Sequence, residues 1–432
     1  MIENKKILII TYYWPPDNSS GVQRWGYFAH FLAKYGLDIQ VVTVNPKWAS
    51  YKNQDKSFKP LVKGINTHST KTIELLKLYS FATTGHPSKG IPRGSINDQK
   101  NIFKRISNYI KSNFFIPDAR LGWNTFAYRK AKKLITDPKN TIVITTGPPH
   151  STHLVGQRLK NIFHRLTWIC DFRDPWLELY SNANAPQNKR AREKNRSLEK
   201  MVLRNADQVI TVGPSLVKLL RSKLPSNKHD KVNFFYNGFD HYKMDKIPHE
   251  NPKDFIITFI GLIPDDYQVE GFIHALQKFT TTISGSRNVI LRLAGNISPN
   301  FINQLENIST IKVNYLGFIS HAESLKLMKS ASLLFTILPT QKFDEILISG
   351  KLMEYIASKK PILCLANKNG DAASLIKKTK SGKTFTNDET DKIADFISAC
   401  YRKEFVVTEQ IDIIGYSRES IANSLYTFLK GL

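Results

Sequence analysis

The sequence predicts an α/β protein of two consecutive domains, each built around a doubly wound parallel sheet. Its 432 residues suffice for two or three domains of ordinary size. Short apolar runs alternate with amphipathic stretches along most of the chain, which is typical of parallel strands covered by helices on both faces. A polar stretch at residues 241–253, with two prolines and no periodicity, interrupts this alternation and indicates an interdomain linker.

The first domain is expected over residues 1–240. Residues 7–11 are apolar, and large apolar side chains then recur every three or four positions from Trp25 to Tyr35, which predicts a helix with one buried face. With an apolar run at 39–44, this helix makes a βαβ unit. The same alternation predicts strands at 141–145, 167–170, 208–212 and 232–236, and helices at 126–135, 151–163, within 188–205 and from 214 onward.

The second domain is expected over residues 254–405. Residues 406–432 form a tail whose helix, at about 417–429, could pack anywhere, including back on the first domain. Because ligands of doubly wound sheets bind at the carboxyl ends of the strands, we expect the functional site in a cleft between the two domains. The strands of the second domain are expected at 255–260, 289–294, 313–318, 333–337 and 362–365.

The chain is strongly basic. Its 62 Lys and Arg exceed its 36 Asp and Glu by 26, which favours nucleic acid, a phosphorylated substrate or an acidic membrane surface as partner. Half of this excess lies in residues 51–140, where 18 basic and 5 acidic residues are interleaved with aromatic ones. Such a segment suits anionic lipid headgroups, although an ordinary solvated surface has the same composition. No helix-turn-helix, zinc or RNA-binding signature supports a nucleic-acid partner.

Two further features predict a cytoplasmic protein. The sequence contains no run of about 18 apolar residues, the length that a helix needs to span a bilayer. The amino terminus enters a predicted strand directly, without the longer apolar stretch of a secretory signal. Cys170, Cys364 and Cys400 lie far apart without metal-ligand spacing, so we expect them to be buried in a reducing compartment.

Two loops that follow predicted strands place candidate residues at a helix start. Gly21 permits close approach of a ligand, and the helix that follows offers free N–H groups to a phosphate or a sugar hydroxyl. Neither a G-x-G-x-x-G nor a P-loop pattern is present, which disfavours a dinucleotide cofactor. His150 and His153 flank the start of another helix, and two histidines beside Gly-Pro-Pro favour a functional role over a structural one.

Two turns that contain Asp and Arg have structural alternatives. Asp171, Arg173 and Asp174 follow a strand, where they could bind an acceptor hydroxyl, orient a histidine or clamp a phosphate; a salt bridge that organises the turn explains them equally well. The turn at 117–123 contains Asp118 and Arg120, for which an ion pair in a structural corner is the preferred interpretation.

The segment 349–363 is the most informative one in the second domain. Ser349 is placed to cap a helix, Gly350 follows it, and Lys351 lies in the first turn, where its charge suits a diphosphate. Glu354 comes one turn later. A carboxylate there can accept hydrogen bonds from two ribose hydroxyls, although an isolated glutamate on a helix is more often solvated.

Together these segments resemble the retaining, family-4-like glycosyltransferases of GT-B fold, of the type that assembles bacterial cell-surface polysaccharide. Enzymes of this family have two Rossmann-like domains that face each other across a nucleotide-sugar cleft. The similar segments occur in the family's order and leave only about residues 48–113 and the C-terminal tail without a counterpart. They are KKILIITYYWPPDNSSGVQRW, TTGPPHSTHLVG, ICDFRDPW, ADQVITVGPS, FFYNGFD, FIGLI, LRLAGN, VNYLGFISHAE and GKLMEYIASKKPIL.

The resemblance implies a hexosyltransferase-type enzyme that moves a sugar from a nucleotide-sugar donor to a glycan or lipid-linked acceptor. It implies front-face retention, in which the leaving diphosphate stays close to the acceptor hydroxyl. It also implies that the enzyme requires no bound metal and no other cofactor. The expected partners are the nucleotide sugar, the acceptor and an anionic inner-membrane surface, on which the protein would be peripheral, but no nucleic acid. A catalytically weak nucleotide-sugar-binding homologue is one alternative; a nucleic-acid-binding protein is another, favoured by the net charge alone.

The resemblance also implies roles for single residues. His150 matches a histidine at the carboxyl end of a strand, and Glu354 matches the last glutamate of a Glu-x7-Glu motif; with Asp174 they are the expected catalytic residues. At the first glutamate of that motif the chain has Ile346, with Glu345 one residue earlier. The residues expected to bind donor or acceptor are Gly21, Arg173, Asn237, Gly261, Ser349, Gly350 and Lys351.

The chain departs from the family pattern at the Arg/Lys pair that holds the donor diphosphate. Leu262 and Glu270 stand at these two positions. We therefore expect Lys351 to replace the pair, and Arg24 and Arg292 are weaker candidates for the same role.

Overall fold

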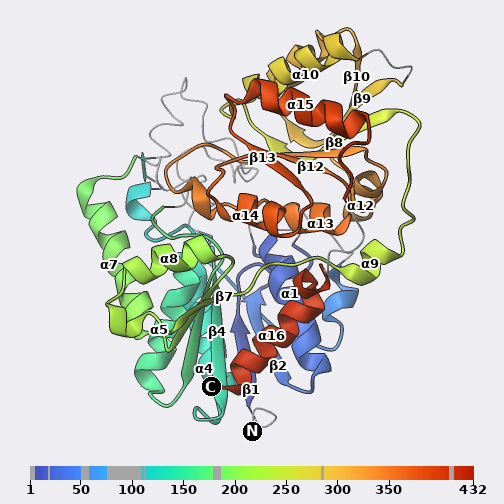
Figure 1. Cartoon of the computed structure of the whole chain (residues 1–432). Helices are drawn as coiled ribbons and strands as arrows, with labels where there is room; N and C mark the ends of the chain where they lie inside the picture. Colours follow the sequence, from blue (N-terminus) through green and yellow to red (C-terminus); the bar gives the residue numbers. More distant parts are fainter. Residues whose placement is uncertain are drawn as a thin grey trace. The chain divides into compact units, whose positions relative to one another are not determined.

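The computed structural model of the chain describes residues 5–17, 20–49, 58–74, 109–110, 112–178, 186–283, 287–407 and 413–432. It contains two compact units. Unit 1 comprises residues 1–236 together with 421–432, and unit 2 comprises residues 237–420. Each unit is a parallel sheet flanked by helices, so the predicted α/β fold class of two doubly wound sheets is confirmed (Figure 1).

The sheet of unit 1 is parallel and, over the described residues, has the strand order β3-β2-β1-β4-β5-β6-β7. β3 was not predicted, because its residues NTHST are polar and mostly exposed at the edge of the sheet. The strands are β1 Lys6–Ile10, β2 Asp38–Val44, β3 Asn66–Thr70, β4 Thr141–Gly147, β5 Thr167–Phe172, β6 Gln208–Thr211 and β7 Val232–Phe234.

The core on one face of this sheet joins segments from both ends of the chain. Trp25, Phe28 and Leu32 of α1 are buried together with Leu425 and Leu429 of α16. Burying one such side chain contributes about 1.5–3 kcal/mol, so the last helix is an integral part of this core. The helices are α1 Ser20–Lys34, α4 Asn124–Leu134, α5 Ser151–Ile162, α7 Lys189–Asn205, α8 Pro214–Ser222 and α16 Arg418–Lys430, whose residues from Ile421 onward belong to unit 1.

The sheet of unit 2 is also parallel, with the order β10-β9-β8-β11-β12-β13. β10 ends at Tyr315, earlier than predicted, and the chain turns at Gly317 (φ 62°), a conformation that glycine adopts readily. β13 was not predicted, since its four residues GKTF carry little apolar signal. The strands are β8 Phe255–Ile263, β9 Val289–Ile297, β10 Ile311–Tyr315, β11 Leu333–Ile337, β12 Ile362–Leu365 and β13 Gly382–Phe385.

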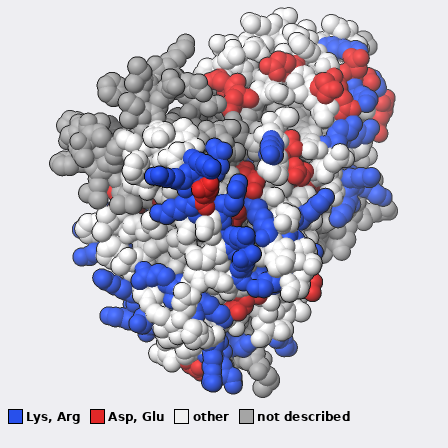
Figure 2. All heavy atoms as spheres, turned by 90° about the vertical axis from the view of Figure 1, so that its left-hand side faces the viewer, with Lys and Arg blue, Asp and Glu red and all other residues white. Residues whose placement is uncertain are grey.

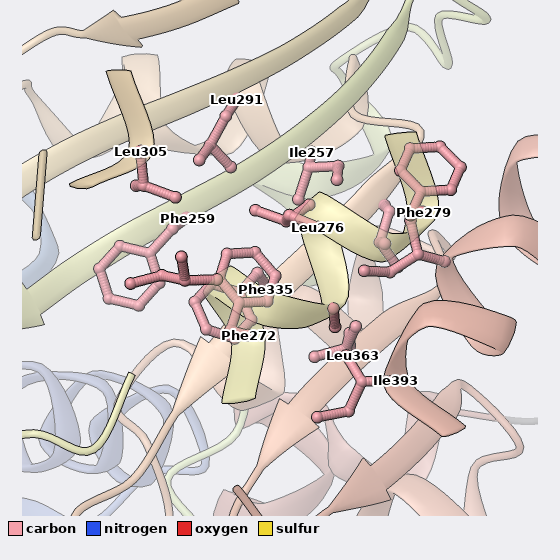
Figure 3. Close-up of a cluster of buried hydrophobic side chains, with 14 of the residues drawn as sticks. Ile257, Phe259, Phe272, Leu276, Phe279, Leu291, Leu305, Phe335, Leu363 and Ile393 are labelled. Carbon is pink, nitrogen blue, oxygen red and sulfur yellow. The ribbon is translucent and has the colours of Figure 1, made fainter. Parts of the chain in front are cut away.

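A cluster of buried aromatic and aliphatic side chains forms a core of unit 2 (Figure 3). Phe272 of α10 stacks on Phe335 of β11, with ring centroids 3.9 Å apart. A short helix, α9, begins after Asp240 in the stretch predicted to be a linker, because this side chain accepts a hydrogen bond from the Lys243 amide. The helices are α9 His241–Asp245, α10 Glu270–Thr282, α11 Pro299–Glu306, α12 His321–Lys329, α13 Leu352–Ala357, α14 Asp371–Lys378 and α15 Thr390–Tyr401.

Both sheets have a point at which the strand order reverses. It lies between β1 and β4 in unit 1 and between β8 and β11 in unit 2. Loops that leave the carboxyl ends of such strands open a crevice in which ligands of doubly wound sheets bind. The loop after β4 carries His150, and the loop after β11 carries residues 349–351. The fold therefore places several sequence-predicted residues at these edges.

Candidate functional site

Gly21 and Arg173 lie against each other at the switch point of unit 1. A Cβ atom on Gly21 would fall 2.5 Å from Cζ of Arg173, so glycine allows the guanidinium to pack on the start of α1. Nη1 of Arg173 donates a hydrogen bond to Oγ1 of Thr146 at 2.8 Å, and Nη2 donates to the carbonyl oxygen of Pro148. The structure thus brings two predicted binding residues into one half-buried, cationic site.

The pKa of Arg173 is lowered by its burial, and its electrostatic surroundings offset only part of this effect. Burial lowers the pKa of the guanidinium, whereas the nearby carboxylates of Asp171 and Asp174 raise it. Asp174, which was expected to be catalytic, is half-buried and lies close enough to Arg173 to contribute to this partial offset. The loop after β5 therefore presents a cation, which can bind an anionic group, and a carboxylate, which can accept a hydrogen bond from a hydroxyl.

Asp171 and Arg24 form a buried ion pair that is structural. Oδ1 of Asp171 lies 3.1 Å from Nη2 of Arg24, and Oδ2 accepts hydrogen bonds from Nε1 of Trp25 at 2.5 Å and from Oγ1 of Thr146 at 2.8 Å. Arg24 also donates to the carbonyl oxygen of Phe235 at 2.6 Å. This network ties α1 to β4, β5 and the end of the sheet, so the Arg24 guanidinium is not available to a diphosphate.

His150 lies in an aromatic environment at the start of α5. Its ring stacks on Trp176 with centroids 5.0 Å apart, and its Nε2 is 3.3 Å from the carbonyl oxygen of Pro175. Burial lowers the pKa of His150 well below its usual value, and the neighbouring His153 lowers it further. The imidazole is therefore neutral at pH 7, and it can exchange a hydrogen bond with a hydroxyl but adds no charge for a phosphate.

His153 is packed beside His150. It stacks on Phe172 with ring centroids 4.6 Å apart, and burial lowers its pKa to about 3. A Cβ atom on Gly147 would lie 2.7 Å from Nε2 of His153 and 2.8 Å from Nδ1 of His150, so both nitrogens face this glycine. Neither nitrogen has a hydrogen-bond partner in the described part of the chain. The other nitrogen of each ring has a partner, since Nδ1 of His153 lies 3.0 Å from Oγ1 of Thr145, so both packing and hydrogen bonds position the pair.

The turn at 117–123 is structural, as expected, but its two charged residues do not pair with each other. Asp118 accepts hydrogen bonds from the amide and hydroxyl of Ser151 at 2.7 and 2.8 Å, at the start of α5. Arg120 instead pairs with Glu74, whose Oε2 lies 2.7 Å from its Nη1. The predicted Asp118–Arg120 ion pair is therefore wrong, because each side chain has a nearer partner from a distant segment.

In unit 2, Glu354 is the centre of a cluster of basic side chains. Its Oε1 lies 2.7 Å from Nε2 of His321 and 3.8 Å from Nη2 of Arg418, and its Oε2 lies 3.4 Å from Nζ of Lys351. Burial raises the pKa of Glu354, but Lys351, the hydrogen bond from His321 and the Arg418 charge outweigh it and lower the pKa to about 2. Glu354 is therefore ionised at any physiological pH.

The start of α13 differs from the prediction. The helix begins at Leu352, and the residue in the cap position is Lys351 rather than Ser349. The Ser349 hydroxyl accepts a hydrogen bond from the Lys351 amide at 3.3 Å, a local contact two residues along the chain that competes with capping. Gly350 is exposed, and no atom lies within 4 Å of a Cβ atom added there. This backbone is consequently accessible.

Gly261 lies near the carboxyl end of β8, where three strand ends approach closely. Gly295 of β9 has φ 116°, and a Cβ atom on it would fall 1.9 Å from the Gly261 carbonyl oxygen. The Gly295 amide donates to the carbonyl oxygen of Gly317 at 2.7 Å. Leu262 follows Gly261 and is 41 % exposed, and Glu270 is the exposed first residue of α10. No cation therefore stands at either position.

Two other candidates, Arg292 and Asn237, form no hydrogen bond or ion pair with Glu354 within the residues that the structure describes. Arg292 bonds at the far end of α12, and Asn237 lies two residues before Phe239, whose carbonyl oxygen accepts a hydrogen bond from the Arg418 amide. Arg292 donates to the hydroxyl of Ser330 at 2.9 Å, directly after the C-terminal end of α12. His321 begins that nine-residue helix, so Arg292 lies roughly one helix length, about 13 Å, from it. Asn237 is exposed at the first position of unit 2, beside the segment in which Phe239 pairs with Ser417.

The sequence analysis missed His321 and Arg418 as members of the cluster. His321 follows Ser320, which caps α12, and the sequence contains this capping signal. Nothing in the local pattern relates it to Glu354, which is 33 positions away, or relates Arg418 to either residue. Only the packing of α12, α13 and the start of α16 brings these side chains together.

The positive charge of the chain is concentrated in unit 1. Its segments contain 40 Lys and Arg against 15 Asp and Glu, a net charge of +25, whereas unit 2 contains 22 against 21, a net charge of +1. Figure 2 shows Lys and Arg side chains spread over this unit. Part of the predicted basic segment 51–140, including Lys104, Arg105 and Lys111, lies outside the described residues. Exposed basic residues of α7 include Lys189, Arg190, Arg192, Lys194, Arg196 and Lys200.

The other titratable groups of the described residues form no metal-ligand set. Over the described ranges, no three His, Cys, Asp or Glu side chains gather as they would around a metal ion. Cys170, Cys364 and Cys400 are buried and not in disulfides, as expected, and burial raises the pKa of Cys364 to about 12. No helix in the described part of the chain is long and apolar enough to cross a bilayer.

Solved structures resemble this fold, although neither a protein-family model nor a curated protein sequence matches the chain. Sucrose-phosphate synthase from Thermosynechococcus elongatus aligns with a TM-score of 0.60 and 14 % identity over 99 % of this chain and 98 % of that one. A glycosyltransferase from Rickettsia africae aligns with a TM-score of 0.60 and 15 % identity, over 99 % of this chain and 98 % of that one. Anabaena HepE, solved in complex with UDP and glucose, aligns with a TM-score of 0.58 and 14 % identity, over 99 % of this chain and 100 % of that one. The fold is that of the GT-B glycosyltransferases.

Proposed function

We propose that the protein is a retaining hexosyltransferase that moves a sugar from a nucleotide-sugar donor to a glycan or lipid-linked acceptor in the assembly of cell-surface polysaccharide. The observation that carries the proposal is the cluster around Glu354, which combines a fixed carboxylate with a half-exposed lysine beside the switch point of unit 2. The GT-B fold supports it, and so does HepE, a protein of similar fold that binds UDP and glucose.

In this proposal unit 2 holds the donor. Lys351 contacts the diphosphate, and the accessible amide of Gly350 adds a donor for a phosphate oxygen. A carboxylate has about four acceptor positions. Since the three basic groups around Glu354 occupy up to three of them, one is left for a ribose or sugar hydroxyl. These groups bind the nucleotide and stabilise the charge that develops on the departing diphosphate.

Unit 1 holds the acceptor. Arg173 and Asp174 provide a charged and a polar contact, Gly21 allows the acceptor to approach the backbone, and the neutral His150 provides a hydrogen bond. In the transfer step the bond from the anomeric carbon to the diphosphate oxygen breaks and a bond to the acceptor oxygen forms on the same face. The acceptor proton passes to the leaving diphosphate, so the reaction needs no resident cofactor and no strong base of the protein.

We further propose that the protein works at an anionic inner-membrane surface in the cytoplasm. The net charge of +25 on unit 1 and the exposed basic residues of α7 support this location. Each Lys or Arg near an anionic bilayer contributes about 1 kcal/mol, so a few such side chains suffice for reversible binding. The same charge would also attract nucleic acid, but without a recognition motif it carries no proposal of that kind.

A catalytically weak homologue that only binds nucleotide sugars is the second candidate, because Leu262 and Glu270 stand where related enzymes have a cation pair. A thermal-shift screen against a panel of nucleotide sugars identifies the donor, since a ligand of the native state raises the melting temperature. Product formation and donor hydrolysis then separate the two candidates. Binding without turnover would indicate the weak homologue, and no stabilisation by any nucleotide sugar would refute both.

The same assay tests Glu354. Glu354→Ala should lower kcat/KM at least tenfold, which corresponds to about 1.4 kcal/mol or more. The matched control is Glu306→Ala, which removes an exposed glutamate at the end of α11 in the same unit and should leave kcat/KM unchanged. Unchanged kinetics in a folded Glu354→Ala protein would show that Glu354 does not contact the donor.

A further inference from the structure

Two of the three basic residues around Glu354 come from distant parts of the sequence, and the third, Lys351, lies three residues before it. His321 is the first residue of α12, Lys351 directly precedes α13, and Arg418 is the first residue of α16. The backbone of Arg418 is fixed in unit 2, because its amide donates to the carbonyl oxygen of Phe239 at 2.8 Å. Three separate elements therefore hold one carboxylate.

The three basic residues differ in how deeply they are buried. The side chains of His321 and Arg418 are 11 % and 7 % exposed, whereas that of Lys351 is 29 % exposed. His321 makes the shortest contact with Glu354, at 2.7 Å, and Lys351 approaches the other oxygen at 3.4 Å. Lys351 has a flexible side chain and is the most exposed of the three to solvent. It is therefore the member of the cluster that can turn to a ligand at least cost.

A buried carboxylate that loses one of its cations is costly unless others remain, because an unpaired charge in the interior is poorly solvated. If Lys351 alone balanced Glu354, it could not turn toward a phosphate without leaving such a charge behind. His321 and Arg418 remove this conflict, since both lie close to Oε1, the oxygen that Lys351 does not contact.

We infer that His321 and Arg418 are positioning residues that keep Glu354 fixed so that Lys351 is free to bind the donor diphosphate, an inference that rests on the proposed function. Neither residue is required to touch the donor. Their effect reaches the ligand through Lys351, so it is measurable as a coupling between substitutions.

The test measures the affinity of UDP, ADP and GDP by titration calorimetry, and uses the diphosphate that binds most tightly. Lys351→Ala should weaken its binding at least tenfold in the otherwise unchanged chain. In a His321→Ala or Arg418→Gln background, Lys351 is needed as the counter-charge of Glu354, so adding Lys351→Ala should weaken binding less than threefold. The His321→Gln side chain can still donate a hydrogen bond to Glu354. In this background, Lys351→Ala should therefore weaken binding of the diphosphate by most of the factor seen in the unchanged chain.

The matched controls are His274→Ala, an exposed histidine of α10, and Arg402→Gln, an exposed arginine that pairs with Glu404. In both backgrounds Lys351→Ala should retain its full effect, and thermal unfolding of each variant confirms that it is folded. If Lys351→Ala weakens binding of the diphosphate by the same factor in every background, His321 and Arg418 do not position Glu354. This inference is then overturned, whereas the proposed function is not. If no nucleoside diphosphate binds the unchanged chain, the proposed function falls as well.

Discussion

Replacing Glu199 by glutamine should change how the stability of unit 1 depends on pH. Glu199 lies on α7 with a side chain that is 2 % exposed, and its Oε1 is 2.7 Å from Nζ of Lys223. The same Nζ contacts Glu178 at 2.6 Å. Burial raises the pKa of Glu199 to about 7; Lys223 opposes this rise and Glu178 adds to it. The carboxyl group is thus about half protonated in the folded protein at neutral pH.

The size of the effect follows from the two pKa values. In the unfolded chain the pKa is near the usual 4.5, so folding raises it by 2.5, and each unit corresponds to about 1.4 kcal/mol. Below pH 4.5 the Glu199 carboxyl group is protonated in both the folded and the unfolded state, so it does not lower the free energy of unfolding. As the pH rises from 4.5 to 7, the unfolded chain releases its proton while the folded protein largely retains it, so the free energy of unfolding falls by about 3 kcal/mol; above pH 7 both states are ionised and it changes little further. The Glu199→Gln side chain does not titrate, so the free energy of unfolding of this variant does not fall with pH for this reason.

The stability of Glu199→Gln relative to the unchanged chain should therefore rise by about 3 kcal/mol between pH 4.5 and pH 8. For a unit of this size, 1 kcal/mol shifts Tm by about 2–4 °C, so the difference in Tm should change by about 6–12 °C. Scanning calorimetry at pH 5, 6, 7 and 8 measures it. Glu193→Gln, on the exposed side of the same helix, is the control. Parallel Tm curves for Glu199→Gln and the unchanged chain would refute the argument.

Three further predictions follow from the two units. Lys351→Ala should weaken binding of a nucleoside diphosphate, measured by calorimetry, by a larger factor than binding of the nucleoside; equal weakening would show that Lys351 does not contact the diphosphate. Gly295→Ala should lower the free energy of urea unfolding by more than Gly317→Ala, which costs about 1–2 kcal/mol, because both have positive φ but only the former places a Cβ atom on a backbone oxygen. The protein should co-sediment with anionic but not zwitterionic vesicles at low salt, be released at high salt, and lose binding when Arg190, Arg192, Lys194 and Arg196 are changed to Glu. Changing Lys377, Lys378 and Lys380 of unit 2 to Glu is the control, and equal partitioning onto both kinds of vesicle would contradict an electrostatic interaction.

Much of the fold could be predicted from the sequence because helix and strand periodicities are local. The spacing of Trp25, Phe28 and Leu32 predicts the face of α1 that is buried, and the apolar runs predict the central strands of both sheets. The loops with Gly21 and His150 could be placed at the carboxyl edge for the same reason, since parallel strands end at the same side of a sheet. The edge strands β3 and β13 were missed, because short or polar strands at an edge carry little apolar signal.

The partner of each charged side chain, in contrast, was decided by the tertiary structure. Asp171 could have served a ligand, yet it pairs with Arg24, which is 147 positions away, and Asp118 caps a helix instead of pairing with Arg120. Glu354 was recognised in the sequence, but its contact with His321 was not. A charge buried in the interior must find a counter-charge or a hydrogen bond wherever packing brings one within reach. Since that proximity is set by how helices and strands pack, no local pattern in the sequence encodes it.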